Sequence, residues 1–428
     1  MKIAKIRTGT RATAAVLAAL ALSITACSTK NDDDEPAQNA SAGTDGLKVG
    51  QGVTDTEIHI GGLTDLTGPY GILGKSTTNG QKLYFDQLNA KGGVCGRQVV
   101  VDVKDHGYDV QKATTAYNEL SGKVVGFSQL IGSAIVNQLA PEIEKAGLLT
   151  TPQAWASNLL GKQAIQVTSS TYDIQMVNGV WNLVQSMGLK PGDKVGHIFT
   201  EDEFGENSSA GAKFAAQAAG IEVVDQKVKP TDRDMTAAVT ALKSAGVKAI
   251  LVAASPTQLG PIMGVSEAAN FKVPVLTHTV GFHQSMLGTA AGPAIESRLQ
   301  IVSAVPSPQD SQPVLQQMSA DYQAKFPGEA PDLGVLSGYT SAAIVTEAIK
   351  KACGMKDLTP AGIVKAHRSN SQVDSGYGLT LDFSSPAKPP TYMTYMLKID
   401  KTKPSGVATA SQAFEAPNAK SFPLPKTG

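Results

Sequence analysis

The sequence predicts an α/β fold of two lobes, each a mostly parallel sheet flanked by helices. Short apolar runs rich in β-prone residues alternate with helical patterns along most of the chain. The alternation comes in two sets of about a hundred residues, the usual size of one domain. With 428 residues, of which 42% are hydrophobic and 17% charged, the chain is long and apolar enough for two cores.

The first predicted unit runs strand, loop, helix between Ile58 and Ala90. The run 58–63 is short and apolar, like a buried parallel strand, and Leu83, Tyr84 and Leu88 are spaced like one helical face before two glycines end the helix. The loop 64–75 between them then lies at the carboxyl end of a strand, where open α/β sheets bind ligands.

A phosphate-binding loop is not expected in this stretch. The sequence GILGKS at 71–76 resembles the end of G-x-x-x-x-G-K-[ST], but the first glycine falls at Gly68 instead of position 69. The chain also lacks G-x-S-x-G, H-E-x-x-H, C-x-x-C and G-x-G-x-x-G, so the sequence predicts no enzyme and no cofactor.

The remaining elements follow in the same alternation. Predicted strands are 99–103, 124–131, 148–151, 195–199, 221–228, 249–254, 273–276, 299–305 and 392–399, with an extended run at 165–170. Predicted helices are 110–121, 136–145, 173–187, 206–219, 234–245, 258–270, 313–326, 337–352 and 359–368. Residues 401–428 are rich in Pro, Ala and Ser and are predicted to form a surface tail.

The N-terminus predicts export. Four basic residues precede the apolar run 12–24, which is too short to span a bilayer of about 30 Å but suits a signal peptide. The run ends in ITAC, which resembles a bacterial lipobox, so residues 1–26 are expected to be removed and Cys27 lipidated. The alternative is an ordinary secretory signal with an incidental cysteine.

Residues 27–56 are expected to be a flexible tether that starts at the lipidated cysteine. The part from 28 to 50 is polar and lacks the apolar residues that a fold buries, and about 30 such residues span roughly 30 Å. Removal of residues 1–26 leaves 33 Lys and Arg against 37 Asp and Glu. This acidic balance argues against a nucleic-acid partner.

Two cysteines remain in the exported chain, Cys95 and Cys353. An oxidising compartment permits a disulfide between them, which would constrain the unfolded chain by about 4–5 kcal/mol. Two separate buried thiols are the alternative.

Several motifs together resemble one known family. They are I-x-I-G-x-L-x-D-x-T-G-P at 58–69, LNAKGGVCGR at 88–97, VDVKDHGYDVQKA at 101–113, GSAIVNQLAPEIEKAGLLTTPQA at 132–154 and EDEFGE at 201–206. From residue 58 to about 399 the chain resembles the type I periplasmic binding proteins of the leucine/isoleucine/valine-binding family, the solute receptors of ABC importers. The lipobox agrees with the tethered form of such receptors.

The resemblance implies a two-lobed, Venus-flytrap fold whose chain crosses the hinge three times and closes on a small solute. Lobe one would comprise residues 57–170 and 303–383, and lobe two 171–302 and 384–400. Both Cys95 and Cys353 then fall in lobe one, which favours a disulfide.

The resemblance also implies ligand contacts. The family holds a carboxylate with a hydroxyl and backbone N–H groups, which match Ser133 and the stretch of Gln153, Ala154 and Trp155; neutral donors at helix N-termini suit an anion. Alternatively, Ser133 only caps a helix, and Trp155 only fills a core. Further candidate contacts are Tyr70, Leu73, Phe204, Ser255, His278 and Thr279.

The chain departs from the family at 277–283, where amino-acid receptors carry an acidic residue that pairs with the ligand ammonium. Here the sequence THTVGFH holds no carboxylate. An α-amino acid ligand is therefore disfavoured, because a buried ammonium needs a partner, unless Glu201 or Asp202 supplies it. His278 and His283 lack a third ligand nearby, so no metal site is predicted.

The sequence thus predicts a monomeric, lipid-anchored receptor on the outer face of the cytoplasmic membrane. It would deliver a small polar or amphiphilic solute, such as a compound like a branched-chain amino acid, an amide, or an aromatic or carboxylic compound, to an ABC permease and its ATPase. The alternative is a lipoprotein that senses a ligand and signals to a membrane partner.

Overall fold

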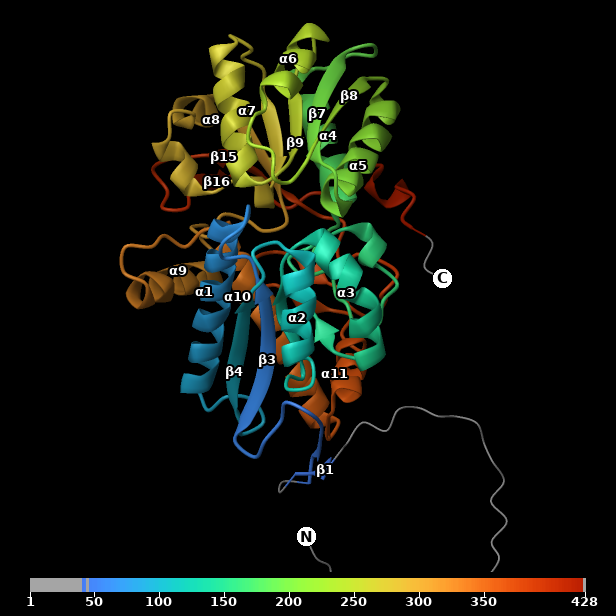
Figure 1. Cartoon of the computed structure of the whole chain (residues 1–428), viewed down its shortest axis with the longest axis vertical. Helices are drawn as coiled ribbons and strands as arrows, with labels where there is room; N and C mark the ends of the chain where they lie inside the picture. Colours follow the sequence, from blue (N-terminus) through green and yellow to red (C-terminus); the bar gives the residue numbers. More distant parts are fainter. Residues whose placement is uncertain (1–40, 44–45, 426–428) are drawn as a thin grey trace, which may run out of the picture. The chain divides into compact units, whose positions relative to one another are not determined.

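The computed structural model describes residues 41–43 and 46–425, and Figure 1 shows them as two α/β lobes. Each lobe has its own sheet, and the chain passes between the lobes three times. The passages lie between Thr150 and Tyr172, between Ser303 and Pro313, and between Leu381 and Tyr395. The predicted two-lobed α/β class and the three crossings are confirmed.

The sheet of lobe one has the order β4-β3-β5-β6, with all neighbours parallel. Its strands are β3 (Glu57–Thr64), β4 (Gln98–Asp105), β5 (Gly126–Leu130) and β6 (Leu149–Thr150). Successive side chains of a strand point to opposite faces. Ile58 and Ile60 of β3 therefore face one layer of helices, and Leu63 faces the other.

Helices cover both faces of this sheet (Figure 1). The face of Ile58 packs against α1 (Gly71–Ala90), α10 (Leu333–Gly354) and α11 (Pro360–His367). The face of Leu63 packs against α2 (Val110–Leu120) and α3 (Ser133–Ala146). Helix α9 (Pro313–Lys325) also packs on lobe one, where the Asn79 amide of α1 donates to the Tyr322 hydroxyl at 3.4 Å.

The sheet of lobe two has the order β16-β15-β11-β10-β9-β7-β8. Its parallel strands are β7 (Lys194–Thr200), β8 (Glu222–Val228), β9 (Ile250–Ala253), β10 (Val275–His278) and β11 (Leu299–Ser303). Strands β15 (Tyr395–Ile399) and β16 (Val407–Thr409) add to one edge in antiparallel direction. Helices α4 (Tyr172–Met187) and α5 (Glu203–Ala219) cover one face, and α6 (Thr236–Ser244), α7 (Pro256–Ala268) and α8 (Gly292–Arg298) the other.

The remaining elements are short. Strands β1 (Ser41–Ala42), β2 (Lys48–Val49) and β12 (Asp357–Leu358) form a small sheet, and β13 (Val373–Asp374) pairs with β14 (Thr380–Leu381). Short 3-10 helices are η1 (Ser157–Leu159), η2 (Thr279–Gly281), η3 (Gln284–Gly288) and η4 (Ala419–Ser421).

The predicted tether is too long at its carboxyl end. Val49 is buried, and β2 pairs in parallel with β12 of lobe one, so the chain is already part of the fold there. The polar composition of 28–50 did not reveal this pairing, because a strand of only two residues hardly changes the composition of the segment. Cys27 and the predicted signal peptide 1–26 lie outside the described residues.

The prediction of a surface tail at 401–428 is wrong for the described part. Val407–Thr409 is strand β16, and Ala416 and Ala419 are buried in the core against α4 and α5. The predicted boundary failed because three strand residues and two small apolar residues give a weak hydrophobic pattern.

Helix α1 begins earlier than predicted, at Gly71, so GILGKS forms the first turns of a helix instead of a loop. A side chain on Gly74 would meet the Asp65 carbonyl oxygen at 1.7 Å, which explains glycine at this close approach. Lys75 pairs with Glu329 of lobe one at 2.9 Å. The expectation against a phosphate-binding loop stays a prediction.

The predicted disulfide is confirmed: Cys95 and Cys353 are bonded, with their Cα atoms 6.3 Å apart. Both cysteines lie on lobe one: Cys95 in the turn before β4 and Cys353 at the end of α10. Within residues 41–43 and 46–425, no helix is both long enough and apolar enough to cross a membrane.

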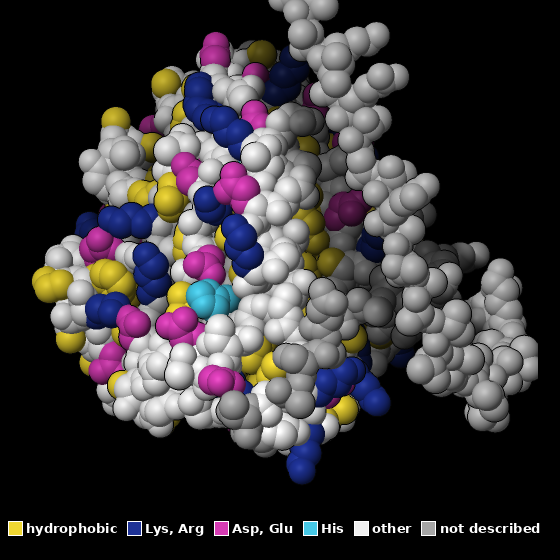
Figure 2. Space-filling view, turned by 60° about the horizontal axis from the view of Figure 1, so that its bottom comes forward, with side chains coloured by type: hydrophobic (Ala, Val, Ile, Leu, Met, Phe, Trp, Pro, Cys, Tyr) yellow, Lys and Arg dark blue, Asp and Glu magenta, His cyan; other side chains and the backbone are white. Residues whose placement is uncertain are grey.

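Acidic and basic side chains are interspersed on the surface. Figure 2 shows Lys and Arg next to Asp and Glu over the face in view, with no broad basic area on it. Lys104 and Glu119, for example, pair at 2.7 Å. Such exposed pairs add little stability, and the mixed charge gives this face no electrostatic footprint of nucleic-acid binding.

Candidate functional site

A narrow cavity lies between the two lobes, where the carboxyl ends of strands from both sheets meet. The empty space among its lining atoms is about 570 Å³, which includes solvent at its open side. The lining residues are Tyr70, Leu73, Thr77, Tyr108, Ile131, Gly132, Ser133, Gln153, Trp155, Tyr172, Phe204, Thr279, Val280, Gly334 and Ser337.

The position of the cavity follows from the topology. Residues after β3, β4, β5 and β6 line it from lobe one, and residues after β7 and β10 line it from lobe two. Loops at the carboxyl ends of parallel strands share one edge of a sheet, so chain segments far apart in sequence come together. Seven of the predicted contacts lie here: Tyr70, Leu73, Ser133, Gln153, Trp155, Phe204 and Thr279.

Ser133 is the first residue of α3, and Gly132 is the N-cap. The alternative of Ser133 as a helix cap is therefore wrong. Gly132 adopts φ 106°, and a side chain there would approach the Tyr108 ring to 2.9 Å. Because the cap has no side chain, no side chain caps this helix, and its first-turn N–H groups and positive dipole end face the cavity edge.

The Gln153 side chain has one partner and one free end. Its Nε2 donates to the Ser341 hydroxyl of α10 at 2.9 Å, whereas Oε1 is buried without a partner among the described residues. An amide can turn over, and a hydroxyl can donate as well as accept. In either orientation, Gln153 keeps one unpaired polar group beside the cavity.

Aromatic rings form one wall of the cavity. The rings of Trp155 and Tyr172 lie 5.8 Å apart, and those of Tyr172 and Phe204 lie 4.5 Å apart. The Trp155 indole is fixed by its N–H, which donates to the Thr168 hydroxyl at 3.1 Å. Trp155 is 3% exposed and packs in the core of lobe one, so it both fills the core and lines the cavity.

Two further tyrosines face this wall from lobe one. The rings of Tyr70 and Tyr108 lie 5.0 Å apart, and the Tyr108 hydroxyl lies 3.4 Å from Asp202 Oδ2. Burial raises the pKa of Tyr70, Tyr108 and Tyr172 well above the ordinary value. The three phenols therefore remain protonated in the folded protein, where they can donate hydrogen bonds but carry no charge.

His278, predicted as a ligand contact, lies behind the wall. Its ring is fully buried, 5.6 Å from the Tyr172 ring, with Nδ1 3.2 Å from Gln175 Oε1 and Nε2 3.0 Å from Ser208 Oγ. Ser208 Oγ also lies 3.2 Å from His197 Nε2. Since the serine has one proton to give, one imidazole donates to it and the other accepts. Both histidines can stay neutral in this arrangement, and only His197 Nδ1 has no hydrogen-bond partner among the described atoms of the two rings. His278 therefore supports the wall and does not line the cavity.

Two other predicted contacts also do not line the cavity. Ser255 is the N-cap of α7 in a capping box with Gln258, because the short helix start after β9 uses its hydroxyl locally. Ala154 is completely buried in the core of lobe one. Thr279 does line the cavity, although its hydroxyl already donates to Ser303 Oγ at 3.1 Å and accepts from the N–H of Ala304.

The lining carries no formal charge among the residues that the structure describes. Asp202, considered as a partner for an ammonium, caps α5 and accepts hydrogen bonds from the N–H of Gly205 and the Thr200 hydroxyl. Glu201 does not line the cavity either. His278 and His283 turn to different partners, and no cluster of His, Cys, Asp and Glu suited to a metal occurs within 41–43 and 46–425.

Sequence reasoning missed part of the lining: Thr77, Tyr108, Ile131, Gly132, Tyr172, Val280, Gly334 and Ser337. Tyr108 could have been found, because it lies in the loop after a predicted strand at the same sheet edge as Ser133. Gly334 and Ser337 belong to the start of α10, about two hundred residues further on. No local pattern marks that helix start as part of the site.

Comparisons with known proteins agree with this architecture. Residues 57–404 match the model of a family described as periplasmic binding proteins. A solved structure, the fatty acid ABC transporter substrate-binding protein from Thermomonospora curvata, is 40% identical and superposes with a TM-score of 0.88, covering 90% of this chain and 99% of that one. A branched chain amino acid ABC transporter protein from Thermus thermophilus with bound valine is 19% identical, with a TM-score of 0.75, and covers 86% and 98%.

Curated relatives are more distant. The Leu/Ile/Val-binding protein BraC3 of Rhizobium johnstonii is 27% identical over 45% of this chain. The match spans about half of that protein's length, 53%, and the same holds for the Brucella melitensis homolog 3. The Leu/Ile/Val-binding protein homolog 7 of Brucella abortus is 23% identical over 78% of this chain and 88% of its own length. The chain belongs to the periplasmic binding protein family, with homologues among the Leu/Ile/Val-binding proteins.

Proposed function

We propose that this chain is the extracytoplasmic substrate-binding lipoprotein of an ABC importer for a monocarboxylate with an apolar body, of the fatty acid type. The observation that carries the proposal is the lining of the cavity, which combines aromatic and aliphatic side chains with neutral polar groups only. The 40% identical relative is named for fatty acids, which supports the same ligand class.

The polar end of such a ligand would lie at the start of α3. The Ser133 hydroxyl and the N–H groups of the first turn can donate to a carboxylate, and the helix dipole favours its charge. An α-amino acid fits less well. Its ammonium would be buried among neutral groups without a carboxylate, which is costly.

Gln153 would bind the same polar end. With Nε2 toward the ligand it donates to a carboxylate, and Oε1 then accepts from the Ser341 hydroxyl. With Oε1 toward the ligand it accepts from an amide N–H. The pairing of Gln153 with Ser341 at 2.9 Å supports both orientations, so the site should take a fatty acid or its primary amide.

The binding test uses octanoate, octanamide, leucine and valine with the purified mature chain, by calorimetry. We expect octanoate and octanamide to bind and the two amino acids to bind at least about tenfold more weakly. Binding of leucine or valine in preference to both eight-carbon compounds would overturn the proposal.

The charge of the site gives a sharper comparison. In Gln153→Glu a second carboxylate faces that of octanoate, so octanoate affinity should fall at least about tenfold, whereas octanamide still finds an acceptor. Gln217→Glu makes the same change at an exposed position of α5 and is the control. Equal losses for acid and amide in Gln153→Glu would show that Gln153 does not contact the polar end.

Lipidation of Cys27 belongs to the same proposal and is supported by the ITAC sequence after a short apolar run. The lipid would hold the receptor at the outer face of the cytoplasmic membrane, near its permease and ATPase. Mass spectrometry of the native N-terminus should find an acylated cysteine, and Cys27→Ala should release the protein from the membrane. Unchanged attachment of Cys27→Ala would contradict the anchor.

A further inference from the structure

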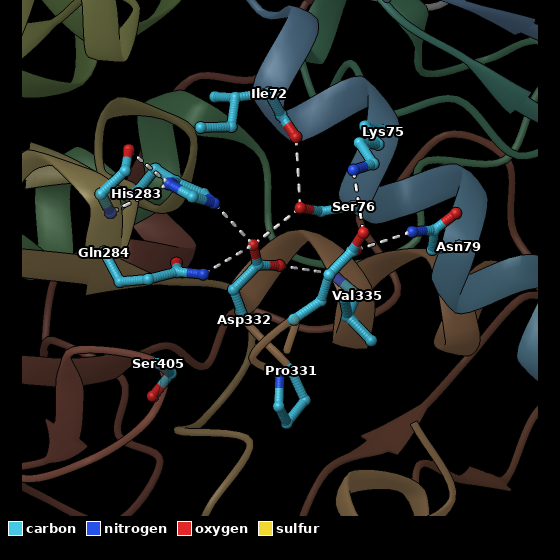
Figure 3. A network of polar contacts seen from close by, with 12 residues as sticks. Ile72, Lys75, Ser76, Asn79, His283, Gln284, Pro331, Asp332, Val335 and Ser405 are labelled. Atoms are coloured by element: carbon cyan, nitrogen blue, oxygen red, sulfur yellow. Dashed lines mark hydrogen bonds and ion pairs between the residues drawn. The ribbon is translucent and has the colours of Figure 1, made fainter. Parts of the chain in front are cut away.

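His283 and Asp332 join the two lobes beside the cavity (Figure 3). His283 lies between η2 and η3 of lobe two, and Asp332 is the N-cap of α10 in lobe one. The imidazole Nε2 lies 3.0 Å from Oδ2 of the carboxylate, and the two side chains are 9% and 5% exposed. The contact is therefore shielded from water on both sides, unlike the exposed ion pairs of the surface.

The hydrogen bonds fix the direction of this contact. The backbone N–H of Ser285 donates to His283 Nδ1 at 3.1 Å, and the Ser285 hydroxyl lies 2.8 Å from the same nitrogen. With Nδ1 as an acceptor, Nε2 carries a proton and donates to Asp332. A hydrogen bond to a carboxylate is roughly twice as strong as one between neutral groups.

Asp332 is held ready from its own lobe. Its Oδ1 accepts from the N–H of Val335 at 2.9 Å, and its Oδ2 accepts from the Ser76 hydroxyl of α1 at 2.7 Å. The Gln284 amide lies at 3.5 Å, the outer limit for a hydrogen bond. When the lobes part, the first two bonds stay, and the bonds from His283 and Gln284, both of lobe two, are lost. The carboxylate is thus a preformed acceptor for lobe two.

Each participant adjoins residues that line the cavity. Thr279 and Val280 precede His283, Gly334 and Ser337 follow Asp332, and Thr77 follows Ser76. The same approach of the two lobes that completes the cavity therefore also forms the hydrogen bond. By linkage, whatever favours the closed lobes favours ligand retention, and a ligand that completes the cavity favours the bond.

We propose that the hydrogen bond from His283 to Asp332 is a latch that holds the closed form and slows ligand release, without contacting the ligand. Both residues act on the ligand only through the position of the lobes. Because the bond forms only on closure, its loss should act on the fraction of closed molecules and on the release rate. It should leave the preference among ligands unchanged.

A ligand-free experiment tests the latch through a second contact between the lobes. Asn137 Nδ2 of α3 donates to Glu203 Oε1 of α5 at 3.1 Å, and both side chains are accessible. In a chain with Asn137→Cys and Glu203→Cys, a short bifunctional methanethiosulfonate links the two thiols only when the lobes are closed. The Cys95–Cys353 disulfide has no free thiol and does not react.

In this background, His283→Phe keeps a planar ring but removes the donor, and the linking rate should fall at least about fivefold. Asp332→Asn keeps an N-cap for α10 and should lower the rate in the same direction. The matched control is His59→Phe, because His59 Nδ1 lies 2.9 Å from Asp102 within lobe one. Linking rates within twofold of the parent in both latch variants would overturn the proposal.

A second measurement uses octanoate as the probe and rests on the proposed function. Release of octanoate, followed by stopped-flow tryptophan fluorescence, should be about tenfold faster in His283→Phe, with the ratio of octanoate to octanamide affinity unchanged. If the wild-type chain does not bind octanoate, the proposed ligand class fails and the linking experiment still decides on the latch. Unchanged release in His283→Phe would contradict the latch.

Discussion

Three buried histidines should make the fold sensitive to acid. Burial lowers the pKa of His197, His278 and His367 to about 3 each, from 6.5. A base whose folded-state pKa is lowered stays neutral in the fold while the unfolded chain takes up its proton. Stability is then complete above pH 6.5 and is lost as pH falls from 6.5 toward 3.

The size of the effect follows from the proton count. Well inside this window each histidine lowers the free energy of unfolding by about 1.4 kcal/mol per pH unit, or about 4 kcal/mol for all three. A domain is typically stable by about 5–15 kcal/mol, so unfolding should begin around two units below pH 6.5. His197 and His278 share Ser208, and a proton on either ring would break this chain of hydrogen bonds behind Tyr172.

Urea unfolding at pH 7.5, 6.5, 5.5 and 5.0, with ligand absent, measures the slope directly. Replacement of one of the three histidines, His367→Gln, should reduce the slope of the free energy of unfolding against pH between pH 6.5 and 5. The reduction should correspond to about one proton, or about 1.4 kcal/mol per pH unit. His367 lies in lobe one and is not part of the cavity lining, with Nε2 3.0 Å from Gln166 Oε1. A free energy of unfolding that stays constant from pH 7.5 to 5.0 would refute the reasoning.

Three changes test other parts of the structure. Trp155→Ala should lower the stability by about 3–5 kcal/mol, which thermal melts can show. Calorimetry should find a weaker affinity for octanoate and a better affinity for dodecanoate relative to octanoate. An unchanged preference between the two chain lengths would exclude Trp155 as a wall of the binding site. Cys353→Ser opens a cross-link that spans 258 residues and should lower the free energy of unfolding, measured with urea, by about 4–5 kcal/mol. An unchanged free energy of unfolding would show that the disulfide does not stabilise the fold. A chain ending at residue 406 loses β16 and the buried Ala416 and Ala419, so its melting temperature should fall by several degrees; an equal melt would mean that the last residues do not stabilise lobe two.

Local patterns were sufficient for most of the fold. The strand at 57–64 and the helix at 110–120 follow from apolar runs, a helical face and an N-cap, all of which act within a few residues. The start of α1 was missed because Gly71 and Gly74 look like loop residues. Both lie in the helix, and glycine is needed there because the backbone of Leu66 approaches Gly71 and that of Asp65 approaches Gly74.

The site was predictable only where a local motif carries it. Ser133, Gln153 and Trp155 lie after strands within one continuous stretch, and all three line the cavity. Ser255 also follows a strand, yet it faces its own helix, because the direction of a side chain after a strand depends on packing. Tyr172 enters the cavity from the first residue of α4, and its position depends on the hinge, which leaves no pattern in the sequence.

The covalent path of the chain has a consequence for its response to proteolysis. The Cys95–Cys353 bond closes a ring that contains the parallel strands β7 to β11 of lobe two and the helices around them. A protease that cuts one peptide bond between these cysteines therefore leaves a single covalent molecule. The two ends at the cut stay close to each other, because strands on both sides remain paired in the sheet. A receptor nicked once in this ring would migrate as one chain without reductant and as two fragments with it.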